Sequence, residues 1–142
     1  MEKRVDSKCV FCNICNGDSE TRLLYQDEDY IVFKDIRPYA EHHYLVVTKD
    51  HIPDAKCLTK EQIGIVTTLK ELGRKVLEEA GADLSDSRFG FHWPPFHTVS
   101  HLHMHAISPA SKMGLLGRII FRPDSFGFVT PEYVERRIRA QS

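Results

Sequence analysis

The sequence predicts an α+β protein: an antiparallel sheet of about five strands, with a long helix and a C-terminal helix to one side. Short apolar and β-branched runs separated by turn residues predict the strands. Apolar residues at helical spacing behind a capping-box pattern predict the long helix. Because the chain has 142 residues, we expect a single domain, residues 1–142.

The first half of the chain supplies a hairpin and a central strand. The stretch "TRLLYQDEDYIVFKD" predicts two strands, 23–25 and 30–34, joined by an acidic turn at 26–29. The run "HHYLVVTK", residues 42–49, is rich in β-branched residues and ends before Pro53, which predicts a strand inside the sheet followed by a loop.

Two helices are predicted. Thr59 and Gln62 form a capping-box pattern, and Gly81 can end the helix that follows, at about 60–80. Thr130 as N-cap and Pro131 in the first turn predict the C-terminal helix. The apolar stripe of the long helix, which we interpret as core packing, consists of Ile63, Val66, Leu69, Val76 and Leu77.

Three histidines alternate with apolar residues in "VSHLHMHAIS", residues 99–108. On a strand, His101, His103 and His105 would share one face, and Leu102 and Met104 would face the core. Such a row is either a three-histidine zinc centre or a metal-free site in which one histidine attacks an electrophile while the others bind charge. Spacing alone does not separate these alternatives. Pro94 and Pro95 place a loop before this strand.

The charge and composition of the chain limit the classes of partner that it can bind. A net charge of −1 with no run of like charges argues against nucleic acid, and we expect a small-molecule substrate. We see no apolar stretch long enough to span a membrane and no apolar signal-peptide core. Three of the four cysteines lie in "CVFCNIC", so we expect reduced thiols and a cytoplasmic protein that can also be nuclear.

Two stretches resemble a known family. "SHLHMHAIS" matches the H-φ-H-φ-H-φ-φ signature (φ apolar) of the histidine-triad, or HIT, superfamily, and "FKDIRPYAEHHYLVVTKDHI" is similar to its nucleotide-binding hairpin and strand. The resemblance implies a HIT-like fold with a core at about 9–109 and a C-terminal extension at 110–142. "GFHWPPF" and the long C-terminal segment look most like the third Hint branch, the adenosine 5′-monophosphoramidases, and more distantly like aprataxin.

This resemblance implies a phosphoramidase. Such an enzyme hydrolyses AMP-NH2, AMP-lysine or aminoacyl-adenylate substrates to AMP through a covalent AMP-histidine intermediate, without a catalytic metal. The implied nucleophile is His103. His101, His105 and His43 would donate to the phosphate oxygens, with His42 as the alternative to His43, and the Thr98 hydroxyl would donate to the leaving group.

Further residues correspond to the nucleotide subsite of the family. Asp35 would bind the ribose hydroxyls, although it could instead be a turn residue, and Phe33 and Ile36 would line the base. His97 and the residue after it replace a Gln-Ser pair found in many Hint proteins, which leaves leaving-group specificity open. His92 can also reach the site.

The cysteine pair points to a structural zinc. Several HIT proteins with such a pair bind zinc through it and two histidines, which correspond to Cys9, Cys12, His51 and His101. The alternative is two buried thiols acting as small apolar residues. The resemblance also implies a homodimer, and the long helix at about 60–80 is long enough to form its two-fold contact. Two other functions stay open: a nucleotide-binding scaffold with incidental hydrolysis, and a metal-dependent hydrolase.

Overall fold

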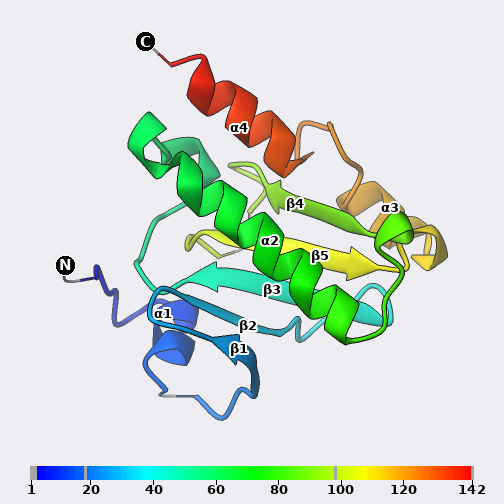
Figure 1. Cartoon of the computed structure of the whole chain (residues 1–142), viewed down its shortest axis with the longest axis horizontal. Helices are drawn as coiled ribbons and strands as arrows, with labels where there is room; N and C mark the ends of the chain where they lie inside the picture. The colour runs from blue at the N-terminus through cyan, green and yellow to red at the C-terminus, as the bar shows by residue number, and fades with distance from the viewer. Residues whose placement is uncertain (1–2, 18, 98, 142) are drawn as a thin grey trace.

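The computed structural model describes residues 3–17, 19–97 and 99–141 and shows one twisted sheet with helices on both faces (Figure 1). Its six strands lie in the order β1-β2-β3-β5-β4-β6, and every neighbouring pair is antiparallel. This confirms the α+β prediction. The strands are β1 Leu23–Gln26, β2 Tyr30–Lys34, β3 His42–Thr48, β4 Arg88–His92, β5 His103–Ser108 and β6 Phe128–Val129.

The predicted hairpin and central strand are both present. β1 and β2 pair across the acidic turn, where a carboxylate oxygen of Asp27 accepts from the backbone N–H groups of Asp29 and Tyr30. β3 lies between β2 and β5 and is almost entirely buried. The sixth strand, β6, was not predicted because two residues are too few to show alternation.

The long helix covers one face of the sheet. A 3₁₀ turn at Lys60–Gln62 leads into α2, Ile63–Glu79, and the Gln62 side chain accepts from the Thr59 backbone N–H at 3.0 Å. The helix lies close to β5, because a Cβ added at Gly73 would come within 2.6 Å of the Met104 Cε atom. After the helix, Gly81 adopts a φ of 82° and turns the chain, as the sequence predicts.

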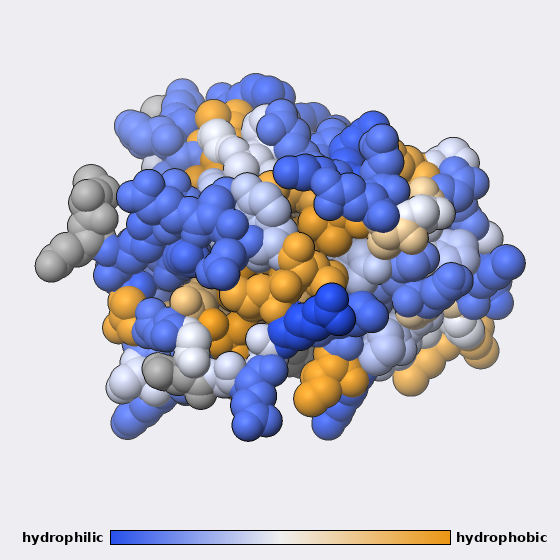
Figure 2. Space-filling view, turned by 60° about the horizontal axis from the view of Figure 1, so that its bottom comes forward, coloured by the Kyte–Doolittle hydropathy of each residue, from blue (hydrophilic) through white to orange (hydrophobic). Residues whose placement is uncertain are grey.

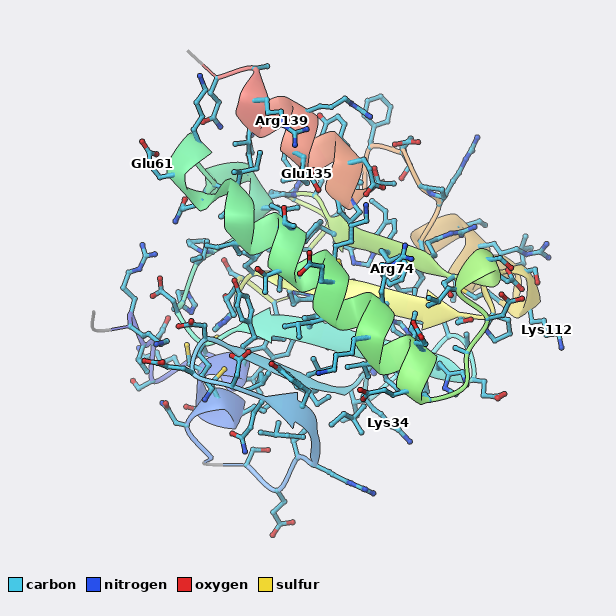
Figure 3. The ribbon with its side chains drawn as sticks, viewed as in Figure 1. Lys34, Glu61, Arg74, Lys112, Glu135 and Arg139 are labelled. Atoms are coloured by element: carbon cyan, nitrogen blue, oxygen red, sulfur yellow. The ribbon has the colours of Figure 1, made fainter. Side chains whose placement is uncertain are left out.

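α4, Pro131–Arg139, packs beside α2 on the same face (Figure 1). Thr130 caps it as predicted, since its side chain accepts from the Tyr133 N–H. Charged side chains such as Arg74 on α2 and Arg139 on α4 are exposed to solvent; Figure 3 labels both. Further 3₁₀ turns lie at Ala55–Cys57, Leu84–Asp86 and Ala110–Lys112.

The two predicted helices, α2 and α4, lie on one side of the sheet as expected, but two shorter helices on the other side were not predicted. Two six-residue helices, α1 Val10–Cys15 and α3 Leu115–Ile120, belong to the opposite face. Phe11 of α1 packs with Phe33 and Leu45 of the sheet, and Gly117 of α3 packs against Tyr39. Helices this short carry too few apolar positions for a periodic pattern to show.

The predicted histidine strand also needs a correction. β5 begins at His103, so His103 and His105 share a face as expected, but His101 precedes the strand. The Leu102 N–H donates to the Ile52 carbonyl at 2.6 Å and so takes this part of the chain out of the β3–β5 ladder. Within the described ranges, no helix is both long and apolar enough to cross a bilayer.

Candidate active site

The paired strands β3 and β5 carry three buried histidines on the face away from α2. Leu45 lies opposite His105 and Val47 opposite His103 in the ladder, while His43 lies two residues before Leu45, opposite Ile107. The exposed fractions are 2% for His43, 8% for His103 and 5% for His105. Buried imidazoles need a partner for each ring nitrogen, so the hydrogen bonds determine what each ring can do.

The hydrogen bonds of His43 fix its tautomer. The backbone N–H of Tyr39 donates to the Nδ1 atom of His43 at 3.1 Å, so Nδ1 carries a lone pair. A neutral His43 must then carry its proton on Nε2, which lies 2.9 Å from Nδ1 of His105. His105 therefore accepts at Nδ1 and carries its own proton on Nε2.

The chain of bonds continues to His92 at the end of β4. His105 Nε2 lies 3.2 Å from His92 Nδ1, and His92 Nε2 lies 3.3 Å from the carbonyl oxygen of Ile120. We call His43, His105 and His92 the imidazole relay. In the neutral relay every ring donates through Nε2 and accepts at Nδ1.

Burial keeps the relay neutral. It lowers the pKa of His43 to about 4, against the opposing effect of Asp35, whose Oδ2 lies 3.3 Å from His43 Nε2. Burial also lowers the pKa of His105 well below its ordinary value, and it lowers that of His92. The ring of Phe121 contributes to this burial, because its centroid lies 5.0 to 5.2 Å from all three relay rings.

His103 has the opposite tautomer. Its Nδ1 donates to the carbonyl oxygen of His101 at 2.7 Å, which leaves the lone pair on Nε2. Burial lowers its pKa to about 4, so that lone pair is free of a proton at neutral pH. The edge of Phe11 packs on the ring at 5.0 Å and 90°. A neutral imidazole fixed in this way is a competent nucleophile.

The four residues predicted to bind zinc come together beside His103. The Sγ of Cys12 lies 3.2 Å from Nδ1 of His51, the Sγ of Cys9 lies 3.3 Å from Nδ1 of His101, and the two Nδ1 atoms are 3.2 Å apart. We call these four residues the thiol–imidazole cluster. One donor atom from each of them lies within 4.8 Å of the others.

The donor set fits zinc. Tetrahedral bonds of about 2.0 to 2.3 Å place neighbouring ligand atoms roughly 3.3 to 3.8 Å apart, close to the spacings found. His101 donates Nε2–H to the Thr48 carbonyl at 2.6 Å, so its Nδ1 is unprotonated and faces the thiols. Burial raises the pKa of Cys12, and a divalent cation would supply the charge that ionises the thiol. The cluster is thus a candidate structural zinc site.

A second group, formed by Asp35, His43 and His105, also brings three donor atoms together, yet it does not suit a metal. The Tyr39 N–H occupies the Nδ1 lone pair of His43, so Nε2 of that ring carries a proton and cannot ligate. The rings of His101, His103 and His105 do not converge on a point either, because the first turns to the thiols and the second to a carbonyl. Their geometry is unlike a three-histidine metal centre.

The other predicted residues are more scattered. Asp35 lies beside His43, and its second oxygen accepts from the Arg37 N–H, which is a turn contact. Phe33 is buried against Phe11, whereas Ile36 is 93% exposed.

His97 lines a small pocket together with His92, His101 and His103, so it lies beside the candidate nucleophile. Thr98 lies outside the described residues. Phe11 and Phe121 could not be recognised as site residues from the sequence, since an isolated aromatic residue in a sequence has the same appearance whether it packs in a core or beside a catalytic ring.

Comparison with known proteins agrees with this geometry. A family model described as "Scavenger mRNA decapping enzyme C-term binding" matches residues 8–121. A solved HIT family hydrolase from Clostridium thermocellum is 30% identical, with a TM-score of 0.69 over 72% of this chain and 91% of that one. The chain belongs to the histidine-triad superfamily.

Curated relatives place it within the histidine-triad proteins. The chain is 44% identical to a Xenopus tropicalis protein named adenosine 5′-monophosphoramidase HINT3, over 95% of this chain and 90% of that protein. It is 36% identical to chicken aprataxin over 60% of this chain and 27% of aprataxin. The predicted resemblance to the third Hint branch, and more distantly to aprataxin, is confirmed.

Proposed function

We propose that this histidine-triad protein is an adenosine 5′-monophosphoramidase that releases AMP from AMP-NH2, AMP-lysine or aminoacyl-adenylate substrates. The observation that carries the proposal is the state of His103, whose neutral ring is held at Nδ1 by the His101 carbonyl and keeps its lone pair on Nε2. The similarity to a relative that bears this enzyme name supports the choice of substrate class.

The reaction has two displacements at phosphorus. His103 Nε2 attacks and an Nε2–P bond forms. With AMP-NH2 or AMP-lysine the P–N bond breaks and the amine leaves with a proton taken up from the pocket, whereas with an aminoacyl-adenylate the P–O bond breaks and the amino acid leaves as its carboxylate without that proton. Water then attacks the same phosphorus, the Nε2–P bond breaks, AMP leaves, and the proton from water restores the pocket. The His101 carbonyl stabilises the positive charge that the ring carries in the intermediate.

The remaining polar groups fall into two roles. We assign His105 to the phosphate side, where its neutral N–H stabilises charge that develops on the oxygens, and we assign His43 to the same side as the residue whose Nε2–H holds His105 through Nδ1. We assign His101 to the thiol–imidazole cluster, since both of its ring nitrogens are already engaged there and with Thr48. Thr98 keeps its proposed role as donor to the leaving group, and His97 that of a leaving-group contact.

For the nucleotide we propose Asp35 as the ribose ligand and Phe33 and Ile36 as apolar contacts of the base. The large exposure of Ile36 supports this, because an apolar side chain at the surface has area left to bury against a ligand. His92 was grouped with these residues on sequence, but its contacts are with the relay.

We further propose that the thiol–imidazole cluster binds one zinc ion with a structural role. All four positions of a tetrahedral site are filled by protein donors, which leaves none for a substrate. The phosphoryl chemistry proposed here runs through the chain's own imidazoles.

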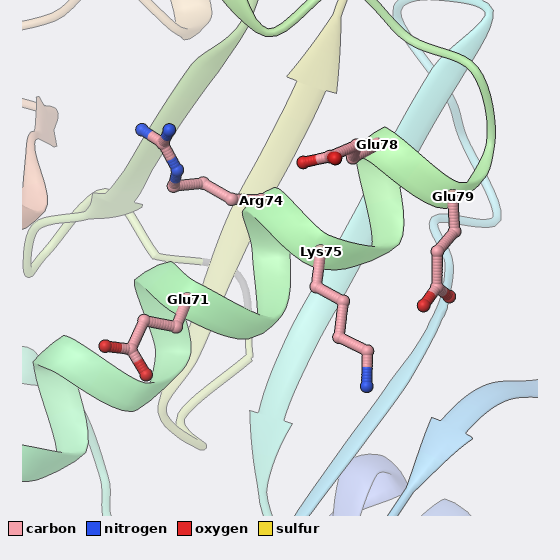
Figure 4. A pocket seen from close by; sticks show the side chains of 5 residues that line it. All are labelled: Glu71, Arg74, Lys75, Glu78 and Glu79. Carbon is pink, nitrogen blue, oxygen red and sulfur yellow. The ribbon is translucent and has the colours of Figure 1, made fainter.

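A homodimer stays a proposal, and the structure changes where to look for its interface. The outer side of α2 is a shallow hollow lined by charged residues, which is a poor two-fold contact (Figure 4). Apolar side chains reach the surface elsewhere, as Figure 2 shows for one face of the molecule. On α3, Leu115, Leu116 and Ile119 are 71%, 62% and 62% exposed. We also propose a cytoplasmic and nuclear location; cell fractionation tests it, and sedimentation tests the dimer.

One assay tests the proposed function: AMP release from AMP-NH2 and AMP-lysine, with and without a chelator. We expect turnover that the chelator leaves unchanged in the folded fraction. Tight AMP binding without turnover would indicate the scaffold instead. Loss of turnover in chelated but still folded protein would indicate a metal-dependent hydrolase.

A further inference from the structure

We propose that His92 is a positioning residue for His105: it accepts the Nε2–H of His105 in the free protein and yields that hydrogen bond to the phosphate when substrate binds. The second half of this statement rests on the proposed function. The first half concerns the free protein and is tested separately.

The ring of His92 is placed to act on His105. The two ring centroids are 4.8 Å apart and the planes meet at 83°, with His92 Nδ1 3.2 Å from His105 Nε2. Phe121 and Phe128 each pack on the His92 ring at 5.1 Å and fix its plane. The pairing of β4 with β6, in which His92 lies opposite Phe128, anchors the backbone.

Backbone groups at both ends fix the direction of the relay. The Tyr39 amide can only donate, so His43 must accept at Nδ1. The Ile120 carbonyl can only accept, so His92 must donate from Nε2. If His105 held its proton on Nδ1 instead, two N–H groups would face each other across 2.9 Å and two lone pairs would face each other across 3.2 Å.

His105 is the relay ring that packs against the candidate nucleophile, His103, so its hydrogen bond to His92 lies close to the site of reaction. The rings of His103 and His105 lie 5.2 Å apart, so phosphorus bonded to His103 would bring phosphate oxygens near His105. A charged phosphate oxygen is a stronger hydrogen-bond acceptor than a neutral imidazole nitrogen. The Nε2–H of His105 would therefore donate its hydrogen bond to the phosphate oxygen instead of to His92. His92 thus keeps the His105 N–H oriented in the free protein, and it competes only weakly with the phosphate for that hydrogen bond.

Removal of the acceptor should therefore affect the transition state more than substrate binding. Without His92 Nδ1, the buried N–H of His105 lacks this partner in the free protein, and the ring is free to turn from the orientation that faces the phosphate. Donors that are pre-oriented toward developing charge act mainly on kcat.

Two variants form a matched pair. His92→Phe keeps a flat ring between Phe121 and Phe128 but offers no nitrogen. His92→Asn is smaller but places an amide oxygen near the position of Nδ1, where it can accept from His105. We expect kcat to fall roughly 10- to 100-fold in His92→Phe with KM within about twofold, and most of kcat to survive in His92→Asn. Equal losses in both variants would overturn the proposal.

Long-range ¹H–¹⁵N NMR of the histidine rings tests the free protein directly. We expect Nε2–H tautomers for His43, His105 and His92 and an Nδ1–H tautomer for His103. A wild-type His105 with its proton on Nδ1 would overturn the proposal even if neither variant folds. Should the tautomers be as expected while wild-type protein releases no AMP, the proposed function fails and the resting contact stands.

Discussion

Two groups of histidines flank His103, and the same side chain does different work in each. In the thiol–imidazole cluster, one donor atom from each residue converges on a common centre. In the imidazole relay, each N–H of one ring meets the lone pair of the next. The difference comes from the backbone. The Thr48 carbonyl accepts a hydrogen bond from the Nε2–H of His101, whereas the Tyr39 N–H donates to the Nδ1 lone pair of His43.

A backbone acceptor therefore frees a ring nitrogen for a metal, and a backbone donor commits the ring to hydrogen bonding. His103 connects the two groups, because its Nδ1–H is bound by the carbonyl of His101, a cluster residue, and its ring lies against His105, a relay residue.

The largest effect is expected at His103. His103→Ala and His103→Asn should lower kcat by roughly 10⁴-fold or more, because both changes remove the Nε2 lone pair that the proposed attack on phosphorus needs, while AMP still binds. Chromatography of released AMP and calorimetry of AMP binding measure the two. Mass spectrometry of quenched wild-type protein should find AMP on His103, and a label on His105 or His43 would refute the assignment.

Next in size is the loss of the cluster. Chelation, or Cys12→Ser, should reduce the free energy of unfolding by something on the order of 5 kcal/mol, since binding free energy at a structural zinc site is folding free energy. Elemental analysis should give at most one zinc per chain. Cys57→Ser is the matched control, because Cys57 is an exposed free thiol outside the cluster. If Cys12→Ser and Cys57→Ser unfold alike, the cluster holds no metal.

Asp35 tests where the relay ends and the sugar subsite begins. Asp35→Ala should weaken binding of AMP by about 1.5 to 3 kcal/mol for each charge-assisted bond lost, and weaken binding of the 2′,3′-dideoxy analogue much less. Calorimetry with both ligands measures the difference. Equal weakening would show that the carboxylate serves only His43 and the turn that it forms with the Arg37 N–H.

The smallest expected effect is on the pH dependence of stability, through the protonation of His43. The pKa of His43 is about 4 in the folded protein and near its ordinary 6.5 in the unfolded chain. As pH falls from 6.5 to 4, His43 becomes protonated in the unfolded chain but stays neutral in the folded protein. The free energy of unfolding that His43 contributes above pH 6.5 is therefore lost across this pH range. Denaturant titrations should show a shallower pH slope in His43→Gln, with the difference from wild type reaching about 2 to 3 kcal/mol near pH 4.

Comparison between the two proteins at each pH cancels the contribution of the cluster, which both contain. The difference should also persist in 0.5 M salt, because burial rather than distant surface charge causes the shift. Identical slopes would mean that His43 is not held neutral by the fold.

Sequence patterns predicted the long elements and the β1–β2 hairpin well, and the two short helices and the two-residue strand poorly. β3, α2 and α4 were predicted because alternation, helical spacing and caps such as Thr59 and Thr130 are local signals. α1, α3 and β6 depend on partners distant in the chain. His101 was wrongly placed on the strand, because its alternation with His103 says nothing of the Leu102 to Ile52 bond that diverts the backbone.

The sequence by itself determined the superfamily and the residue types from which a candidate site is built: the histidine signature, the cysteine pair and the strand that carries His43. Only the tertiary structure decided which nitrogen of each ring is free. That choice is made by the Tyr39 amide and by the carbonyls of Thr48 and Ile120, and the backbone carries the same groups at nearly every residue, so no sequence pattern reveals which of them will meet an imidazole. His101 meets its carbonyl across 53 positions of sequence, and folding alone brings the two together.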